Sequence, residues 1–343
     1  MVKADNAVSR SEGKSGVGEG VDVRAYFYLG LMVLIGSSTA PAARYVVREL
    51  PVGLVPLVRF GVAGLCLLPI VGRCGGDLVR LVREDGRRLL ATALCCVPLN
   101  QTFFLNATRL TSTSHVALIY AAVPMVVLLL AAAVGQERLR TDRLVGVAVS
   151  VLGVAVIGLD SLWRGGGAGH PATATARGDL LLVGAVITWG AYLTLGKPLV
   201  TRHGPLTTLA GTFLIGAALD LPIALITLPG WPPLASATPA AWWGLVYLTF
   251  VSTILALAFQ NLALHRLDAS QVATFGNAAP LLTVLWGVWL FGETVSPALA
   301  LGGLLTLGGI FWTGRNETTA AEPASGFRPQ GLVARAATPL SRP

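Results

Sequence analysis

Long apolar runs, separated by short polar segments, make up most of this chain. They cover residues 25–45, 54–72, 89–107, 114–134, 142–160, 178–199, 206–228, 241–263, 270–291 and 297–315, with ends approximate. Runs of roughly 20 residues can cross a hydrocarbon core of ~30 Å as helices. The runs do not alternate apolar and polar residues as barrel strands do, and backbone polar groups in lipid must be satisfied locally. The sequence therefore predicts an all-α integral membrane protein with ten transmembrane helices.

The charge distribution agrees with a membrane protein. Only 12% of the residues are charged, whereas a soluble domain has about 25%. The net charge of +8 could suggest nucleic acid, but most Lys and Arg residues fall on alternate loops, which is the positive-inside pattern. We therefore expect a multi-pass protein of the cell membrane with both termini in the cytoplasm. The cluster Arg80, Arg83, Arg87 and Arg88 then faces anionic lipid headgroups, and no nucleic-acid partner is expected.

The two ends of the chain and one central segment differ from the apolar runs. Residues 1–22 and 317–343 are rich in Gly, Ser, Ala, Pro and charge, which predicts disordered cytoplasmic tails. Residues 161–177 contain three consecutive glycines and are predicted to be an outer linker. No apolar stretch precedes residue 25, so we expect an uncleaved first span rather than a secretory signal.

An internal repeat relates the two halves. Residues 87–153 match residues 243–309 at an offset of 156 without a gap. The matched anchors are Pro124 and Pro280, Glu137 and Glu293, Gly146 and Gly302, and Gly153 and Gly309. The repeat units, 25–160 and 178–315, each hold five spans. Because five is odd, the second unit begins on the opposite side of the membrane, which predicts two inverted five-helix repeats.

Several motifs resemble a known family. They are Phe103-Phe104-Leu105-Asn106-Ala107-Thr108-Arg109-Leu110, Gly135-Gln136-Glu137-Arg138-Leu139, Gly178-Asp179-Leu180, Phe259-Gln260-Asn261-Leu262 and Phe291-Gly292-Glu293. With the doubled proline-to-glutamate spacing, residues 25–315 resemble an EamA-type transporter of the drug/metabolite transporter superfamily. The resemblance implies export of metabolites or drugs. One departure is Ile35-Gly36-Ser37-Ser38, where many relatives carry a Trp-Gly-Ser-Asn-like motif.

The repeated prolines and glutamates have different predicted roles. Pro124 and Pro280 each precede their glutamate by 13 residues, or ~20 Å of helix, and so lie deep within a span. A proline there kinks the helix and either exposes carbonyls to a cavity or is merely tolerated. Glu137 and Glu293 lie at span ends, where we expect them to hold a loop or cap the following helix rather than to carry protons.

Polar side chains within spans are the candidate cavity residues, because such groups usually face a cavity or a partner. Arg59 could attract an anionic group, pair with a carboxylate, snorkel to the interface, or hold the repeat together. Asp220 is the acidic residue furthest inside a span and is the candidate for protonation. For the other candidates, interhelical hydrogen bonding or packing is an equal alternative. The substrate-cavity candidates are Arg59, Asn100, Gln101, Tyr120, Trp189, Tyr192, Gln260 and Asn277.

Two further features are a pair of basic residues near span ends and a set of regularly spaced glycines. Arg44 and Lys197 lie in matching end regions of spans and are expected to be interface anchors. Glycines seven residues apart in the fifth and tenth spans form smooth stripes for close packing. These stripes could join the two repeats or form a homodimer.

The predicted function is secondary transport of a small organic solute by alternating access between the repeats. No nucleotide-binding loop is present, and the four cysteines lack zinc-site spacing, so neither a cofactor nor a metal is expected. The expected partners are the solute, membrane lipids and, as an open alternative, protons. A membrane sensor or scaffold is the alternative function. An intramembrane enzyme is disfavoured, because the chain has no His-Glu-x-x-His, no Gly-x-Ser-x-Gly and no pair of mid-span acids.

Overall fold

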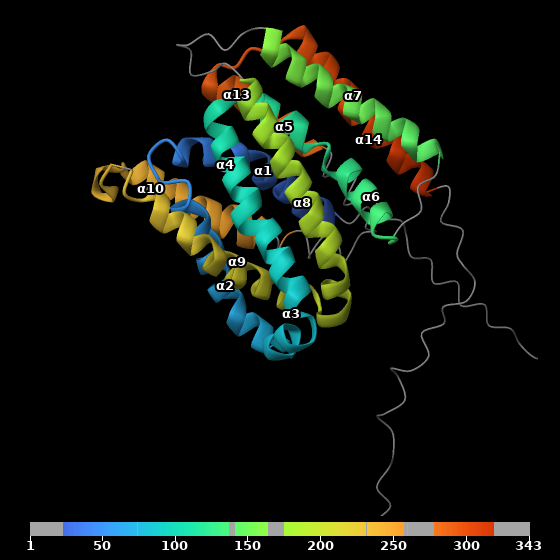
Figure 1. Cartoon of the computed structure of the whole chain (residues 1–343). Coiled ribbons are helices and arrows are strands. Elements are labelled where there is room, and N and C mark those ends of the chain that lie inside the picture. The colour runs from blue at the N-terminus through green and yellow to red at the C-terminus, as the bar shows by residue number, and fades with distance from the viewer. Residues whose placement is uncertain are drawn as a thin grey trace, which may run out of the picture.

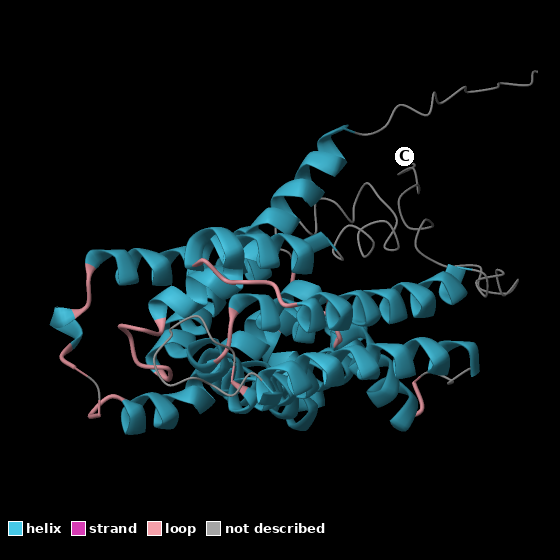
Figure 2. Ribbon diagram, turned by 90° about the horizontal axis from the view of Figure 1, so that it is seen from above, coloured by secondary structure: helices cyan, strands magenta, loops and turns pink. Residues whose placement is uncertain are grey.

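The computed structural model describes residues 23–73, 75–136, 141–163, 175–230, 232–256, 259 and 278–318. All regular elements among these residues are helical, as Figure 2 shows, which confirms the predicted all-α class. The α-helices are α1 (Val23–Val46), α2 (Leu54–Arg73), α3 (Leu78–Leu94), α4 (Asn100–Leu110), α5 (Thr113–Tyr120), α6 (Val123–Ala133), α7 (Thr141–Trp163), α8 (Ala176–His203), α9 (Pro205–Thr227), α10 (Pro239–Val246), α13 (Ala278–Phe291) and α14 (Pro297–Thr318).

Among the described residues, six helical segments are long and apolar enough to cross a membrane. They are Tyr26–Val46, Leu54–Arg73, Leu78–Leu110, Thr113–Ala133, Ala176–His203 and Pro205–Thr227. Shorter apolar helices cover Leu144–Asp160, Pro239–Leu255, Ala278–Phe291 and Pro297–Trp312. The helices coincide with the apolar runs because nearly every residue in those runs can bury its side chain against lipid or a neighbouring helix.

The third helical segment begins earlier than its predicted start at residue 89. It starts at Leu78, where the Asp77 side chain accepts a hydrogen bond from the Arg80 N–H and caps the helix. Its charged first half bends at Asp85, whose φ of −129° and ψ of 25° are not helical. The Asp85 carboxylate contacts the Arg202 and His203 side chains at the end of α8. These contacts link the bend in α3 to the end of α8.

Two short π-helical segments interrupt the regular helices. The first, η1 (Cys95–Leu99), contains Pro98 and joins α3 to α4. The second, η3 (Tyr247–Leu255), continues α10, and the Thr253 hydroxyl there donates to the Leu248 carbonyl at 2.9 Å. Such segments often occur at functional sites, because the widened turn redirects the side chains that follow it.

The predicted break at Pro124 is present. Helix α5 ends at Tyr120, two turn residues follow, and Pro124 lies in the first turn of α6. The proline has no N–H to bond the carbonyl four residues earlier, so the helix restarts rather than continues. Pro280 lies in the first turn of α13, but the residues before α13 lie outside those described.

The glycine stripes join the two halves of the chain. Helices α7 and α14 lie side by side along one flank of the molecule (Figure 1). A Cβ on Gly153 would come within 2.6 Å of the Gly302 carbonyl oxygen, and one on Gly309 within 2.4 Å of the Gly146 carbonyl oxygen. These glycines therefore allow the backbones of α7 and α14 to approach closely within one chain, at a contact between the two halves.

Candidate functional site: a buried cavity and the polar cluster beside it

A cavity of ≈480 Å³ lies among helices from both halves of the chain. Its volume is within the usual range for small-molecule sites. Its walls are mostly apolar, with a few polar groups from α1, α2, α4, α5 and η3. The lining includes Gly36, Thr39, Arg59, Asn100, Gln101, Phe104, Val116, Tyr120, Pro124, Trp189, Ser252, Pro280 and Thr283.

Arg59 is the charged residue among the cavity-lining side chains. It lies on α2 and is only 8% exposed, so it does not snorkel to the interface. Its Nε donates to the Thr253 hydroxyl at 2.8 Å, and its guanidinium lies 5.0 Å from the centre of the Phe60 ring. No carboxylate among the described residues forms an ion pair with it.

Asn100, Gln101 and Tyr120 form a hydrogen-bonded chain in the cavity wall. The Asn100 Nδ2 donates to the Tyr120 hydroxyl and to the Ala185 carbonyl, both at 2.8 Å. The Gln101 Nε2 donates to the Asn100 Oδ1 at 2.9 Å. The Gln101 Oε1 is buried and has no hydrogen-bond partner in the described structure. Thus Asn100 and Gln101, although adjacent in the chain, are linked to one another and both line the cavity.

The aromatic candidates differ in their placement. Trp189 and Tyr120 line the cavity, and Phe104, which sequence analysis did not select, packs edge-on against Tyr120 with ring centres 5.5 Å apart. Tyr192 does not reach the cavity wall. It packs behind Trp189, with ring centres 4.9 Å apart, so its contact with the site is indirect.

The remaining candidates are divided between other locations and undescribed parts of the chain. Asp220 lies on α9, fully buried and away from the cavity lining, and neither of its carboxylate oxygens has a hydrogen-bond partner in the described residues. Gln260, Asn277 and Glu137 lie outside the described residues. Pro124 and Pro280 both line the cavity.

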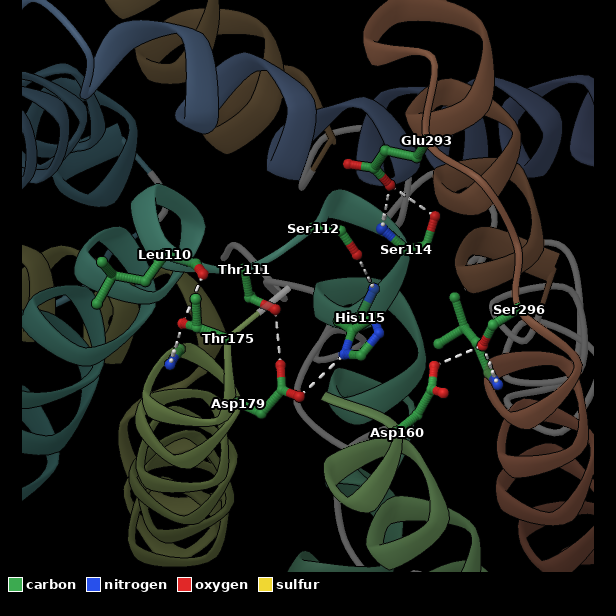
Figure 3. Close-up of polar contacts among 12 residues, drawn as sticks. Leu110, Thr111, Ser112, Ser114, His115, Asp160, Thr175, Asp179, Glu293 and Ser296 are labelled. Carbon is green, nitrogen blue, oxygen red and sulfur yellow. Dashed lines mark hydrogen bonds and ion pairs between the residues drawn. The ribbon is translucent and has the colours of Figure 1, made fainter. Parts of the chain in front are cut away.

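The sequence predicts that Glu293 holds a loop or caps the helix that follows it. In the structure, Glu293 instead caps the start of α5. Its Oε1 accepts from the Thr113 N–H at 2.6 Å. Its Oε2 accepts from the Ser114 N–H at 2.9 Å and from the Ser114 hydroxyl at 2.7 Å (Figure 3). The free N–H groups of a helix N-terminus favour a carboxylate there. The Ser296 hydroxyl caps α14 instead, because it accepts a hydrogen bond from the Leu299 N–H in the first turn of that helix.

The sequence predicts that Arg44 is an interface anchor, and this prediction is wrong. Arg44 is the buried counter-charge of Glu293. It is 5% exposed, forms an ion pair with the Glu293 carboxylate and donates to the Thr113 hydroxyl at 3.2 Å. A short-range reading of the sequence could not find this pair, because 249 residues separate its members. The sequence predicted an interface role because Arg44 is a basic residue in the end region of a span.

A second buried pair holds the other side of α5. The His115 Nδ1 lies 2.9 Å from the Asp179 Oδ2, and the Thr111 hydroxyl donates to the Asp179 Oδ1 at 2.6 Å (Figure 3). Sequence analysis did not select this pair, because Asp179 lies in the first turn of α8, where an acidic residue is common for local reasons. We call Arg44, Thr111, Thr113, Ser114, His115, Asp179 and Glu293 together the polar cluster.

Comparison with known families identifies the chain. The model of the EamA-like transporter family matches residues 23–159 and 176–315. The chain belongs to the EamA-like transporter family. It is accordingly a membrane transporter by family.

Individual relatives of this transporter carry names consistent with the family. A probable terminal-alkyne amino-acid exporter of Streptantibioticus cattleyicolor is 29% identical over 88% of this chain and 97% of its own length. The uncharacterized transporter YyaM of Bacillus subtilis is 23% identical over 82% of this chain and 90% of its own. A solved crystal structure shares the fold, with a TM-score of 0.57 at 22% identity, covering 88% of this chain and 99% of that one.

Proposed function

We propose that this protein is a secondary transporter of the cell membrane that exports small organic metabolites or drugs. The observation that carries the proposal is the cavity, which receives lining residues from both family-matched segments. The relative named as an exporter, and a probable amino-acid metabolite efflux pump of Salmonella typhimurium that is 26% identical over 53% of this chain, favour the outward direction.

Two inverted five-helix repeats, residues 25–160 and 178–315, are part of this proposal. The contact between α7 and α14 supports a two-fold relation, because it is reciprocal. Gly153 meets Gly302, while the repeat counterpart of Gly302, Gly146, meets the counterpart of Gly153, Gly309. Reciprocal contacts of this kind are the mark of a two-fold axis. The π segments also correspond, since the 156-residue offset carries Cys95–Leu99 onto the second part of Tyr247–Leu255.

Alternating access requires one end of the cavity to open while the other closes. The polar cluster lies at the end where α1 and α13 finish and where α5 and α8 begin. Its ion pair, Arg44 with Glu293, and its hydrogen-bonded pair, His115 with Asp179, each join residues from opposite family-matched segments. Our proposed topology, with both termini cytoplasmic, makes this the outer end. Opening there would separate α5 from α13 and α8, and the break before Pro124 supplies a joint for that movement.

The driving force is proposed to be a solute or proton gradient, or exchange. Asp220 is kept as the candidate protonation site, since it is a buried carboxylate without a hydrogen-bond partner among described residues. Its position outside the cavity lining means that any proton effect would act through the packing of α9 against α2 rather than by contact with the solute.

The test has two steps. Medium from cells with and without the protein is compared for metabolites, and the compound most enriched by the protein is then followed in vesicles containing the purified full chain. We expect flux in wild-type vesicles, a strong loss with Trp189→Ala in the cavity, and no loss with Trp289→Ala, whose side chain is 75% exposed. Binding without flux would overturn transport in favour of a sensor or scaffold.

A further inference from the structure

Arg59 is a buried cation whose hydrogen-bonding capacity is mostly unused. A guanidinium has five N–H donors, and only Nε has a partner, the Thr253 hydroxyl. The two terminal nitrogens, Nη1 and Nη2, form no hydrogen bond or ion pair with any described residue. Because a charge buried in a membrane protein without a counter-charge is costly, it usually faces a solute path or a partner.

The surroundings hold this guanidinium in one orientation. The Thr253 hydroxyl, which takes the proton of Nε, is itself tied to the Leu248 carbonyl in η3. The Phe60 ring lies against the guanidinium from the same helix. With the Nε edge occupied, the fork formed by Nη1 and Nη2 stays available to the cavity that Arg59 lines. Two parallel N–H groups of this kind match the two oxygens of a carboxylate.

The cavity also offers one unused acceptor. The Gln101 side chain is held by its Nε2, which donates to Asn100, and Asn100 is held in turn by the Ala185 carbonyl. This chain of bonds leaves the Gln101 Oε1 buried without a donor. Burying an amide oxygen without a hydrogen bond is unfavourable, so an N–H or O–H group of a ligand would relieve it.

The rest of the wall is mostly apolar, and the other polar side chains in it are uncharged. Phe104, Val116 and Trp189 line the cavity together with small residues. Arg59 is the charged group among the lining residues described, so the site can balance one negative charge. A phosphate dianion would need a second cation, whereas a carboxylate would not. The ≈480 Å³ volume limits the solute to a small molecule.

We propose that the cavity binds a small carboxylate-bearing solute, with its carboxylate on the Arg59 fork, a hydrogen-bond donor on the Gln101 Oε1 and an apolar body against Trp189 and Phe104. This inference rests on the proposed function, since it names the substrate class of the same cavity. Arg59 is thus a substrate-binding residue, and Thr253 and Phe60 are the residues that position it.

The probes are four compounds that each carry a phenyl ring: L-phenylalanine, 3-phenylpropionate, 2-phenylethylamine and phenyl phosphate. Acetate, butyrate and octanoate are added as carboxylates of other sizes. Binding to the purified full chain is measured by calorimetry and by the shift in melting temperature. We expect carboxylates to bind, phenylethylamine not to bind, and phenyl phosphate to bind more weakly than 3-phenylpropionate. Phenylalanine should bind more tightly than phenylpropionate, and Gln101→Leu should remove that advantage only.

Arg59→Gln should weaken carboxylate binding by at least about tenfold, and Arg59→Lys should recover only part of it, because an ammonium keeps the charge but not the fork. The matched control is Arg48→Gln, the same change at an exposed arginine. Melting of each variant without ligand shows whether it is folded. If Arg59→Gln unfolds, Thr253→Val is measured in its place, since it loosens the Nε edge and should weaken carboxylates several-fold.

Three results would overturn the inference: equal binding of phenylethylamine and phenylpropionate, unchanged carboxylate binding in the folded Arg59→Gln variant, or no binding by any carboxylate in the series. Failure of the proposed function looks different. Carboxylate binding that depends on Arg59, without flux in vesicles, would retain the site and reject transport. Flux of an exported compound that is unaffected by Arg59→Gln and lacks a carboxylate would retain transport and reject the site.

Discussion

Arg44 and Arg59 are both buried arginines on neighbouring helices, yet their surroundings are opposite. Arg44 pairs with Glu293, and that carboxylate also accepts hydrogen bonds from the start of α5. Arg59 has one hydroxyl partner and faces a cavity. The contrast separates two uses of a buried charge. A fully partnered charge joins helices, whereas a charge left with free donors is available to a ligand.

The polar cluster and the cavity also differ in what they connect. In the cluster, each side chain is bound by another that comes from a distant part of the chain, so loss of one member leaves others buried and unpaired. In the cavity wall, Arg59 and Gln101 are each held through one polar atom, whereas the Arg59 Nη1 and Nη2 and the Gln101 Oε1 have no partner among the described residues. The following predictions challenge or sharpen this contrast.

Glu293→Gln should have the largest effect on stability. Removing one partner of a buried ion pair costs about 3–5 kcal/mol, and the amide nitrogen would also face the N–H groups of Thr113 and Ser114. We expect a clear fall in the melting temperature of the purified protein. The control is Glu49→Gln, because Glu49 accepts from Thr238 at the same end but in an exposed setting. Equal melting of the two variants would show that the cluster is not a stabilising joint.

Arg59→Gln should give the reverse pattern in vesicles. Flux of the exported compound should fall by at least about tenfold, since the lost ionic hydrogen bonds contribute roughly 1.5–3 kcal/mol to binding. The melting temperature should not fall, because no charged partner is left unpaired and the Thr253 hydroxyl keeps its bond to the Leu248 carbonyl. A variant that melts early and transports normally would reverse the roles assigned to the two arginines.

Gly302→Ala should destabilise the contact between α7 and α14 by about 1–3 kcal/mol. The added Cβ would lie 2.8 Å from the Gly153 carbonyl oxygen. Gly308→Ala is the matched control in the same helix, where a Cβ meets nothing within 4 Å. The difference between the two melting temperatures removes the shared gain in helix propensity. No difference would mean that the backbones of α7 and α14 are not held this close.

Asp220→Asn should have the smallest effect. Its carboxylate oxygens have no partner to lose among the described residues, so we expect stability to be unchanged or to rise by up to about 1 kcal/mol, since a neutral amide is less costly to bury than an ionised group. Melting checks this expectation. The same vesicles test the protonation hypothesis, because an unchanged response of flux to a pH gradient would remove Asp220 from proton coupling.

The amino-acid sequence by itself determined the all-helical membrane class, the approximate location of the helices and the break at Pro124. It also indicated five residues that line the cavity: Arg59, Asn100, Gln101, Tyr120 and Trp189. These predictions share one physical basis. Apolar length, proline and a polar group in an apolar span each carry an energetic consequence that depends on local sequence, whatever the partner turns out to be.

Only the tertiary structure decided the partners. The sequence could not show that Glu293 caps α5 rather than α14, that Arg44 is buried rather than at the interface, or that Tyr192 lies behind Trp189. It left open whether the glycine stripes join helices within the chain. Each of these contacts depends on which helix packs against the residue in question. The pairing of helices is set by many packing contacts between residues that are far apart in the chain. Arg44 and Arg59 are both arginines within apolar segments of the sequence. Only their neighbours in the structure make Arg44 a link between helices and leave the Arg59 side chain available to a ligand.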